Sequence, residues 1–329
     1  MKTSTTPRVF QAMPSSGDFP QVGDMVIANS TIRTYLGSGS WVTSQSGIML
    51  PANNWYVNSS TGSDANDGKT WGTAFATIAA AVAAASAGDR IFILGTDFSE
   101  AVTVSLAGLA IIGVGTGPNM ATWTAAADAI CLTLAATDCV VAGIKFRPPA
   151  YSTGTPAAIE LSSASYARIL GNRFQGKTSS YMAIYSPVCN SDNVLIEGNE
   201  FLYMNNITTV YGSCILGVEA GGLSYSAWKI RNNDFNAPVE GININGRVCL
   251  IEGNHFRVNG INADGTTGAV TGSAGSKKMI DLSGTNSYGN HLHGNYLGGA
   301  YTSTLYAKSA SGDDWAGNFN IAGIPTANP

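Results

Sequence analysis

A short pattern of hydrophobic and polar positions recurs along most of the chain. It reads apolar, any residue, Gly, Asn, any residue, then aromatic or apolar. The six copies are Ile169–Phe174, Ile196–Phe201, Ile230–Phe235, Ile251–Phe256, Leu292–Leu297 and Trp315–Asn320. A weaker copy, Val141–Phe146, carries Ile144 in the Asn slot. Short apolar runs with β-branched residues, bounded by Gly and Asn, predict strands and not helices.

The spacing of the copies predicts a solenoid. The Asn slot falls at positions 144, 172, 199, 233, 254, 295 and 318, so the steps are 28, 27, 34, 21, 41 and 23 residues. A period of 21–28 residues with two enlarged steps fits one coil per copy, with loops inserted in two coils. A leucine-rich repeat has a similar period but needs a ladder of leucines, which this chain lacks.

Each slot of the pattern has a predicted task. The first apolar residue points into the core, and Gly allows a sharp bend at little steric cost. Asn tolerates left-handed backbone angles and bonds locally. Because stacked strands lie about 4.8 Å apart, successive Asn side chains can also form a ladder. The aromatic residue enters the core from the next strand and stacks on its neighbours, which stabilises each coil by a few kcal/mol before entropy.

A different pattern precedes the repeats. Trp55–Asn58 predicts a strand, Gly62–Gly68 a polar turn, and residues 73–87 a helix closed by Gly88. Asp89–Leu94 then begins the first coil. The apolar residues that share one face at helical spacing are Phe75, Ile78, Val82 and Ala85. Such a helix can cover the open end of a solenoid and its unpaired strand edge.

The repeat and this opening together resemble the pectin-lyase-like right-handed parallel β-helix superfamily, over roughly residues 54–321. The resemblance implies an all-β fold, a right-handed parallel β-helix over residues 54–329 with a short capping helix. Bacteriophage tailspikes share this opening with enzymes that degrade polysaccharides. Neither the calcium-binding Asp cluster with a basic residue of pectate lyases nor the Asp set of polygalacturonases is found here, so the resemblance carries over no activity.

Residues 1–53 lie outside the repeat and predict a small hairpin module. Val22–Ile27 and Ile32–Leu36 read as short strands, and Gly37–Val42 ends the unit. The unit loosely resembles hairpin modules of bacteriophage tail fibres. Because it is too small to be stable alone, we expect it to dock on the β-helix, on sister subunits or on a larger assembly such as other virion proteins. The alternative is a plain extension of the helix cap.

Composition narrows the classes of function. Charged residues make up 12% of the chain and the net charge is −4, which argues against nucleic-acid binding. No apolar run approaches the roughly 20 residues of a membrane span, and the N-terminus lacks the apolar core of a signal peptide. We therefore expect synthesis in a host cytoplasm. The five cysteines, an odd number without a CxxC, predict small buried side chains, with no metal and no cofactor.

Outward positions of a solenoid form columns with one residue per coil. The column before the Gly slot contains Leu170, Glu197, Arg231, Glu252 and His293. Its alternating charges predict an exposed ladder of ion pairs, each worth about 1 kcal/mol or less.

A second column follows the Asn slot and contains Arg173, Glu200, Asp234, His255 and Tyr296. Neighbouring carboxylates about 5 Å apart suit a retaining glycosidase or a cation site, and like charges raise one pKa. Glu200 and Asp234, with Glu252 of the first column as a third, are thus the weak catalytic candidates. A solvated surface column is the interpretation that we favour.

The enlarged steps hold the candidates for ligand recognition, because loops on a rigid scaffold commonly bind partners. Exposed aromatic rings and amides suit sugar binding, and a contact with a neighbouring subunit is the equal alternative. The ligand-binding candidates on loops and outward columns are Tyr203, Asn205, Tyr225, His293 and Tyr296. His291 and His293 form a His-x-His that could bind a metal, but no third ligand is near in sequence, so a polar patch is favoured.

These observations favour a non-enzymatic bacteriophage virion protein over an enzyme. The expected role is a projecting appendage, either a tail fibre or tailspike or a capsid decoration, that contributes to host attachment. By analogy we expect a homotrimer, anchored to other virion proteins through residues 1–53, that binds a host-surface glycan. The alternative is a polysaccharide lyase or glycoside hydrolase that acts on bacterial surface glycans.

Overall fold

The computed structural model describes most of the chain beyond residue 52 and four strands before it. The described ranges are residues 9–10, 25–28, 31–37, 40–44, 53–95, 97–126, 128–147, 156–176, 182–202, 213–218, 224–236, 240–258, 279–299, 306–307 and 312–320. The chain divides into two compact units, Met1–Ala52 and Asn53–Pro329. Each unit is described by itself.

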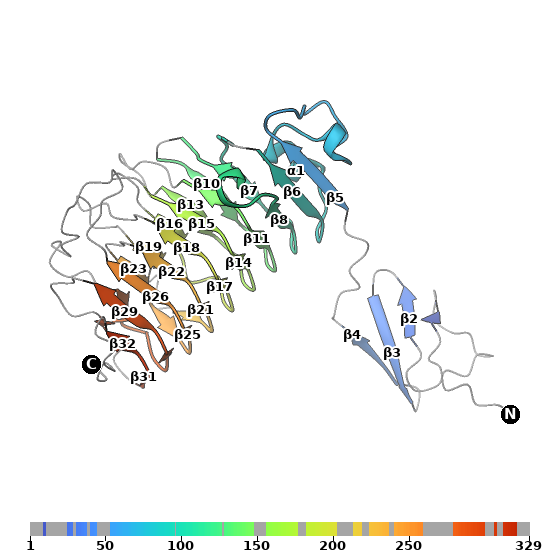
Figure 1. The fold of residues 1–329 in the computed structure, drawn as a ribbon. Helices are drawn as coiled ribbons and strands as arrows, with labels where there is room; N and C mark the ends of the chain where they lie inside the picture. The colour runs from blue at the N-terminus through green and yellow to red at the C-terminus, as the bar shows by residue number, and fades with distance from the viewer. Residues whose placement is uncertain are drawn as a thin grey trace. The chain divides into compact units, whose positions relative to one another are not determined.

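The larger unit is a right-handed parallel β-helix built from three long sheets (Figure 1). Sheet 1 contains β5 (Asn54–Asn58), β6 (Arg90–Leu94), β8 (Ala110–Gly113), β11 (Val140–Ala142), β14 (Arg168–Leu170), β17 (Leu195–Glu197), β21 (Lys229–Arg231), β25 (Leu250–Glu252), β28 (His291–His293) and β31 (Asp314–Ala316). Sheet 2 contains β9 (Thr122–Trp123), β12 (Lys145–Phe146), β15 (Arg173–Gln175), β18 (Glu200–Leu202), β22 (Asp234–Asn236), β26 (His255–Val258), β29 (Tyr296–Gly299) and β32 (Phe319–Asn320). Sheet 3 contains β7 (Val102–Val104), β10 (Ile130–Leu134), β13 (Ala157–Leu161), β16 (Met182–Ser186), β19 (Ser213–Gly217), β23 (Glu240–Ile244), β27 (Ile280–Asp281) and β30 (Tyr306–Ala307).

Each coil takes one strand from sheet 3, then sheet 1, then sheet 2. In every sheet the strands follow chain order and pair in parallel, as the predicted fold requires. The repeats stack in register, since Glu197 lies opposite Arg231 and Glu200 lies opposite Asp234. The enlarged steps therefore skip no coil of sheet 1 or sheet 2. Two further short strands, β20 (Tyr225–Ser226) and β24 (Gly246–Arg247), pair with each other between sheets 3 and 1.

The core is one continuous column, and the aromatic slot forms its most regular part. Rings stack from coil to coil, beginning with Trp123 on Phe146 at a centroid distance of 5.6 Å. The subsequent distances shorten to 4.9 Å for Phe174–Phe201 and 4.5 Å for Phe235–Phe256. The predicted Phe stack is thus confirmed. The first apolar slot is fully buried beside it in every copy except the last, where Trp315 is partly buried.

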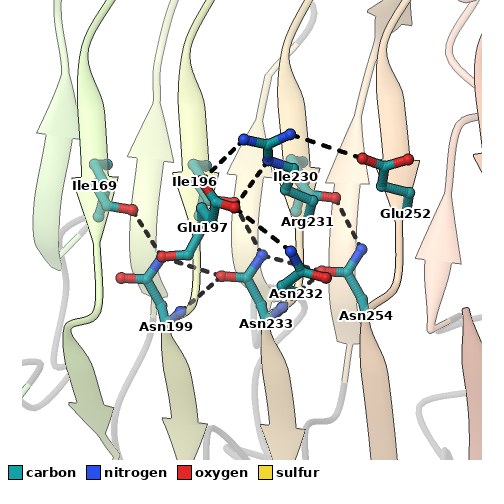
Figure 2. Close-up of polar contacts among 10 residues, drawn as sticks. All are labelled: Ile169, Ile196, Glu197, Asn199, Ile230, Arg231, Asn232, Asn233, Glu252 and Asn254. Carbon is teal, nitrogen blue, oxygen red and sulfur yellow. Dashed lines mark hydrogen bonds and ion pairs between the residues drawn. The ribbon is translucent and has the colours of Figure 1, made fainter.

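The predicted Asn ladder is confirmed, although one of the reasons given for Asn is wrong. Asn233 donates from Nδ2 to Ile196 O and to Asn254 Oδ1, both at 3.0 Å, and its own Oδ1 accepts from Asn199 N at 2.9 Å and from Asn199 Nδ2 at 3.0 Å (Figure 2). The left-handed backbone falls one residue earlier, in the Gly slot, where Asn232 has a φ of 54°. Asn is therefore required by buried hydrogen bonding and not by backbone angle.

A second left-handed corner lies between sheet 3 and sheet 1. One residue per coil adopts a positive φ there: Gly108, Asp138, Tyr166, Asn193, Ala227, Val248, Gly289 and Gly312. In the six corners from Gly108 to Val248 the backbone N–H bonds to the next coil, as in Tyr166 N to Asp192 O at 2.8 Å and Val248 N to Tyr288 O at 3.0 Å. Because this corner holds Gly in three coils and a different residue in each of the other five, the repeat pattern did not predict it.

The cap contains a shorter helix than predicted. After a 3-10 turn, η1 (Trp71–Thr73), the helix α1 spans Ile78–Ala84. Two carboxylates from outside the helix bond to the backbone N–H groups at its start. Asp64 accepts from the N–H groups of residues 76 and 77, and Glu100 accepts from the N–H groups of residues 78 and 79. These carboxylates satisfy the free N–H groups and so set where the helix begins. Ile78 and Ala81 point into the core. A second 3-10 turn, η2, spans Gly117–Asn119.

A buried carboxylate joins the cap to the first coil. Asp89 is 3% exposed and accepts hydrogen bonds from Trp55 Nε1 at 2.9 Å, Asn53 N at 2.8 Å and Ser86 N at 2.8 Å. Burial acts to raise the pKa of the Asp89 carboxyl, but these hydrogen bonds outweigh it, and the pKa lies below its ordinary value. The cap is therefore held by an ionised group near neutral pH.

The N-terminal unit is a four-stranded sheet. Its strands are β1 (Val9–Phe10), β2 (Met25–Ala28), β3 (Thr31–Gly37) and β4 (Ser40–Ser44). β2, β3 and β4 form an antiparallel meander, and β1 pairs with β2 in parallel. The two predicted hairpin strands correspond to β2 and β3, whereas residues 22–24 lie outside the described residues.

All five cysteines lie in the described part of the chain, and no disulfide joins them. Four are buried as predicted, and Cys189 is half-buried. Burial raises the pKa of the Cys131 thiol to about 12 and that of Cys139 to about 11, so these side chains behave as small apolar groups. Among the described residues, no helix has the length and apolar character needed to cross a membrane.

Candidate functional site

The outward column of sheet 1 is a ladder of ion pairs, as predicted (Figure 2). Arg231 lies between two acids, with its Nε 3.0 Å from Glu197 Oε1 and its Nη1 3.9 Å from Glu252 Oε1. Asn232 Nδ2 adds a contact to Glu197 Oε1 at 3.4 Å. All three charged side chains are about one third exposed. Solvent screening at this exposure limits each pair to about 1 kcal/mol or less.

The outward column of sheet 2 places Glu200 and Asp234 on neighbouring coils, and each has an arginine partner. Arg173 Nε donates to Glu200 Oε2 at 2.6 Å. Arg257 donates to both oxygens of Asp234, with Nε 2.9 Å from Oδ1. Hydrogen bonding to Asp234 raises the pKa of Arg257. Acid–base catalysis by Glu200 and Asp234 would have to break these pairs, so the geometry favours the surface-column interpretation.

The predicted exposure of Tyr225 is wrong. Its side chain is fully buried, and its hydroxyl oxygen lies 2.7 Å from Ser186 O and 3.0 Å from Val218 O, which share its one donor proton. The ring packs at 4.9 Å from Trp228 and against Gly217, where a Cβ would come within 2.5 Å of the ring. The extra strand β20 carries Tyr225 inward, so the ring cannot stack on a sugar. Tyr203 and Asn205 lie outside the described residues, as does the inserted loop at 259–278.

The two remaining ligand candidates lie on different sheets and do not form one site. Tyr296 follows His255 in the sheet 2 column, and their rings meet edge to face at a centroid distance of 4.7 Å. His293 lies on sheet 1, on the same side of β28 as His291. Asp314 of the next coil contacts both histidines and is the third group that the sequence left unidentified.

A depression that the sequence did not predict lies at the corner between sheets 3 and 1. It has a volume of about 310 Å³ and draws its walls from four successive coils. The lining residues are Cys189, Asp192, Ser224, Ser226, Arg247, Asn286 and Tyr288. Tyr288 is 44% exposed, and the Arg247 guanidinium carbon lies 5.8 Å from the centre of its ring. Asp192 is oriented by the backbone N–H of Ser226, at 2.8 Å. Polar groups therefore converge around one exposed aromatic face.

The backbone beside this depression is strained. Val248, directly after Arg247, has a φ of 54° and is 53% exposed. A β-branched residue in this conformation costs roughly 1–2 kcal/mol, which glycine at the same corner avoids in other coils. Backbone strain of this kind clusters at binding sites, where the surrounding structure holds it. The sequence alone could not identify this depression, because the residues that line it are far apart in sequence and meet only in the folded chain.

Comparison with known proteins adds structural likenesses at low sequence identity. No protein-family profile and no curated protein matches the sequence significantly. A GH136 lacto-N-biosidase from Eubacterium ramulus is 10% identical with a TM-score of 0.47, and the match covers 82% of this chain and 60% of that chain. ORF18 of Geobacillus virus E2 is 13% identical with a TM-score of 0.40, and covers 96% of this chain and 74% of that one.

An alginate lyase of family PL6 is 16% identical with a TM-score of 0.35, and the match covers 77% of this chain. The chain spans 60% of the length of the lacto-N-biosidase and 40% of that of the lyase. At TM-scores below 0.5 these likenesses assign no activity to the chain.

Proposed function

We propose that the protein is a non-enzymatic structural component of a bacteriophage virion, a projecting appendage that attaches to host-surface glycans. The observation that carries attachment is the depression at Arg247 and Tyr288, on a scaffold whose core is continuous. The ring face of Tyr288 offers an apolar platform, and the guanidinium, carboxylate, amide and hydroxyl groups around it match the groups of a sugar. Arg247 favours a sugar that carries a carboxylate.

The enzymatic alternative, a lyase or glycoside hydrolase, has less support. Its candidates Glu200, Asp234 and Glu252 each have an arginine within ion-pair distance, and they lie on two outward columns. The 310 Å³ depression does not include any of the three. A catalytic acid needs a concave site that excludes water around it, and these carboxylates lie on half-exposed sheet surfaces.

Attachment is tested by binding to purified bacterial surface polysaccharides. We expect the full chain to bind an acidic polysaccharide, and Arg247→Ala or Tyr288→Ala to weaken that binding at least about tenfold, as for loss of a central contact. Tyr166→Ala is the matched control, because Tyr166 is also an exposed tyrosine (54%) at a solenoid corner but lies outside the depression. Equal binding by all variants would reject this site, and cleavage of the polysaccharide would favour the enzymatic alternative.

The appendage role predicts an oligomer whose N-terminal unit anchors it. We expect light scattering to give a homotrimer, three times the 34.0 kDa chain mass, and the full chain to bind phage particles that lack it. A variant without residues 1–52 should keep its circular dichroism but lose binding to particles. A stable monomer at about 10 μM that also fails to bind particles would contradict the proposal, since trimeric assembly and anchoring are its two requirements.

A further inference from the structure

The last described coils bring three metal-ligating side chains together. His291 and His293 project from the same side of β28, because they are two residues apart on a strand. β31 of the next coil pairs with β28 so that Asp314 lies directly opposite His291. The ligand atoms of the three side chains all lie within 4.8 Å of one another.

Two of the three distances between ligand atoms are close to those around a bound ion. Asp314 Oδ2 lies 3.4 Å from His291 Nδ1 and 2.8 Å from His293 Nε2. Ligand atoms around a tetrahedral ion with bonds of 2.0–2.1 Å lie about 3.3 Å apart. The first distance already has this value, and the second is a hydrogen bond in which the ion would replace the proton.

The charge around the three residues also suits a cation. Asp314 supplies the one carboxylate among the three ligands. Glu252 lies opposite His293 on the preceding coil and adds a second negative charge to the column. The side chains of His291, His293 and Asp314 are 39–55% exposed, so water can reach the open coordination positions.

We propose that His291, His293 and Asp314 form a binding site for a divalent transition-metal ion. Two imidazoles and one carboxylate suit Zn²⁺, Fe²⁺, Ni²⁺ and Cu²⁺ better than Ca²⁺ or Mg²⁺, which take mainly oxygen ligands. The ion would take the place of the proton between His293 Nε2 and Asp314, which a neutral imidazole then carries on Nδ1, and would tie two consecutive coils near the C-terminal end of the solenoid. This site is independent of the depression at Arg247, and its test does not bear on attachment.

The experiment is calorimetric titration of the untagged full chain with Zn²⁺, at a pH above the ordinary histidine pKa. We expect one Zn²⁺ per chain, and an affinity lowered at least about tenfold in His293→Ala and in Asp314→Asn. His255→Ala is the matched control, because His255 is the remaining histidine of the chain and lies on sheet 2. It should bind Zn²⁺ as the unaltered chain does.

Two further measurements separate loss of the metal site from loss of folding and identify the ligands. Circular dichroism shows whether each variant is folded, and Co²⁺ in place of Zn²⁺ gives visible absorption bands if the imidazoles bind it. The absence of stoichiometric Zn²⁺ binding at about 100 μM, well above the dissociation constants of specific sites, would overturn the proposal. Undiminished binding by the double variant His291→Ala, His293→Ala would overturn it equally.

Discussion

Asn233→Ala is expected to lower the free energy of unfolding by about 3–5 kcal/mol, because each buried polar group without a partner costs about 1–3 kcal/mol. The alanine removes the acceptor of Asn199 N and the donor to Ile196 O, both of which are buried in the ladder. It also removes both side-chain bonds to the neighbouring rungs, Asn199 and Asn254. Urea unfolding followed by circular dichroism, with fluorescence as a second probe of a single transition, measures the loss.

The matched control is the neighbouring residue. Asn232 is exposed and has the left-handed backbone that Gly occupies in the other described repeats. Asn232→Gly removes only the 3.4 Å contact with Glu197, so we expect a change within about 0.5 kcal/mol, as for surface substitutions in general. A loss below about 1 kcal/mol for Asn233→Ala would mean that backbone pairing, and not the ladder, holds the coils together.

The second large effect is expected in the aromatic stack. Phe235→Ala should lower the free energy of unfolding by about 3–5 kcal/mol, the usual cost of removing a buried phenyl ring and leaving a cavity. Phe235 is fully buried and lies 4.6 Å from Phe201 and 4.5 Å from Phe256, so neither neighbour can move to fill the space without losing its own stacking. The same urea experiment measures this loss.

Phe319→Ala is the control for the aromatic stack. Phe319 also lies on sheet 2, but it occupies the outward column opposite Tyr296 and is 39% exposed. Its replacement should cost clearly less than that of Phe235, since a partly exposed ring buries less apolar surface and leaves no enclosed cavity. Equal losses for the two variants would show that the stack contributes no more than an exposed ring does.

The Asn and Phe columns matter for ligand binding because they keep the coils rigid. A depression assembled from four coils keeps its shape only if the coils stay in register, and the Asn and Phe columns fix that register from inside. We therefore expect recognition at Arg247 and Tyr288 to depend on core residues that never contact a ligand.

The amino-acid sequence by itself determined the period, the parallel stacking and the contents of the core. It could do so because a solenoid places the same slot of every repeat in the same environment, so Phe201, Asn199 and Ile196 each recur with one coil per copy. The two charged columns followed from the same register, which the pairings of Glu197 with Arg231 and of Glu200 with Asp234 confirm. The helix of the cap was predicted, but its start was decided by the carboxylates of Asp64 and Glu100.

Only the tertiary structure decided where surface groups meet. The corner at Val248 has a left-handed backbone in every coil, but five of its eight residues are of five different types other than glycine, so its sequence shows no clear repeat. Tyr225 is buried because the extra strand β20 turns it inward. The repeat pattern could not predict this strand, because it lies in an insertion between two copies. Asp314 reaches His291 because consecutive coils lie one strand spacing apart, whatever the length of the chain between them. Contacts of this kind join residues that are close in space but far apart in the sequence, and no repeat pattern predicts them.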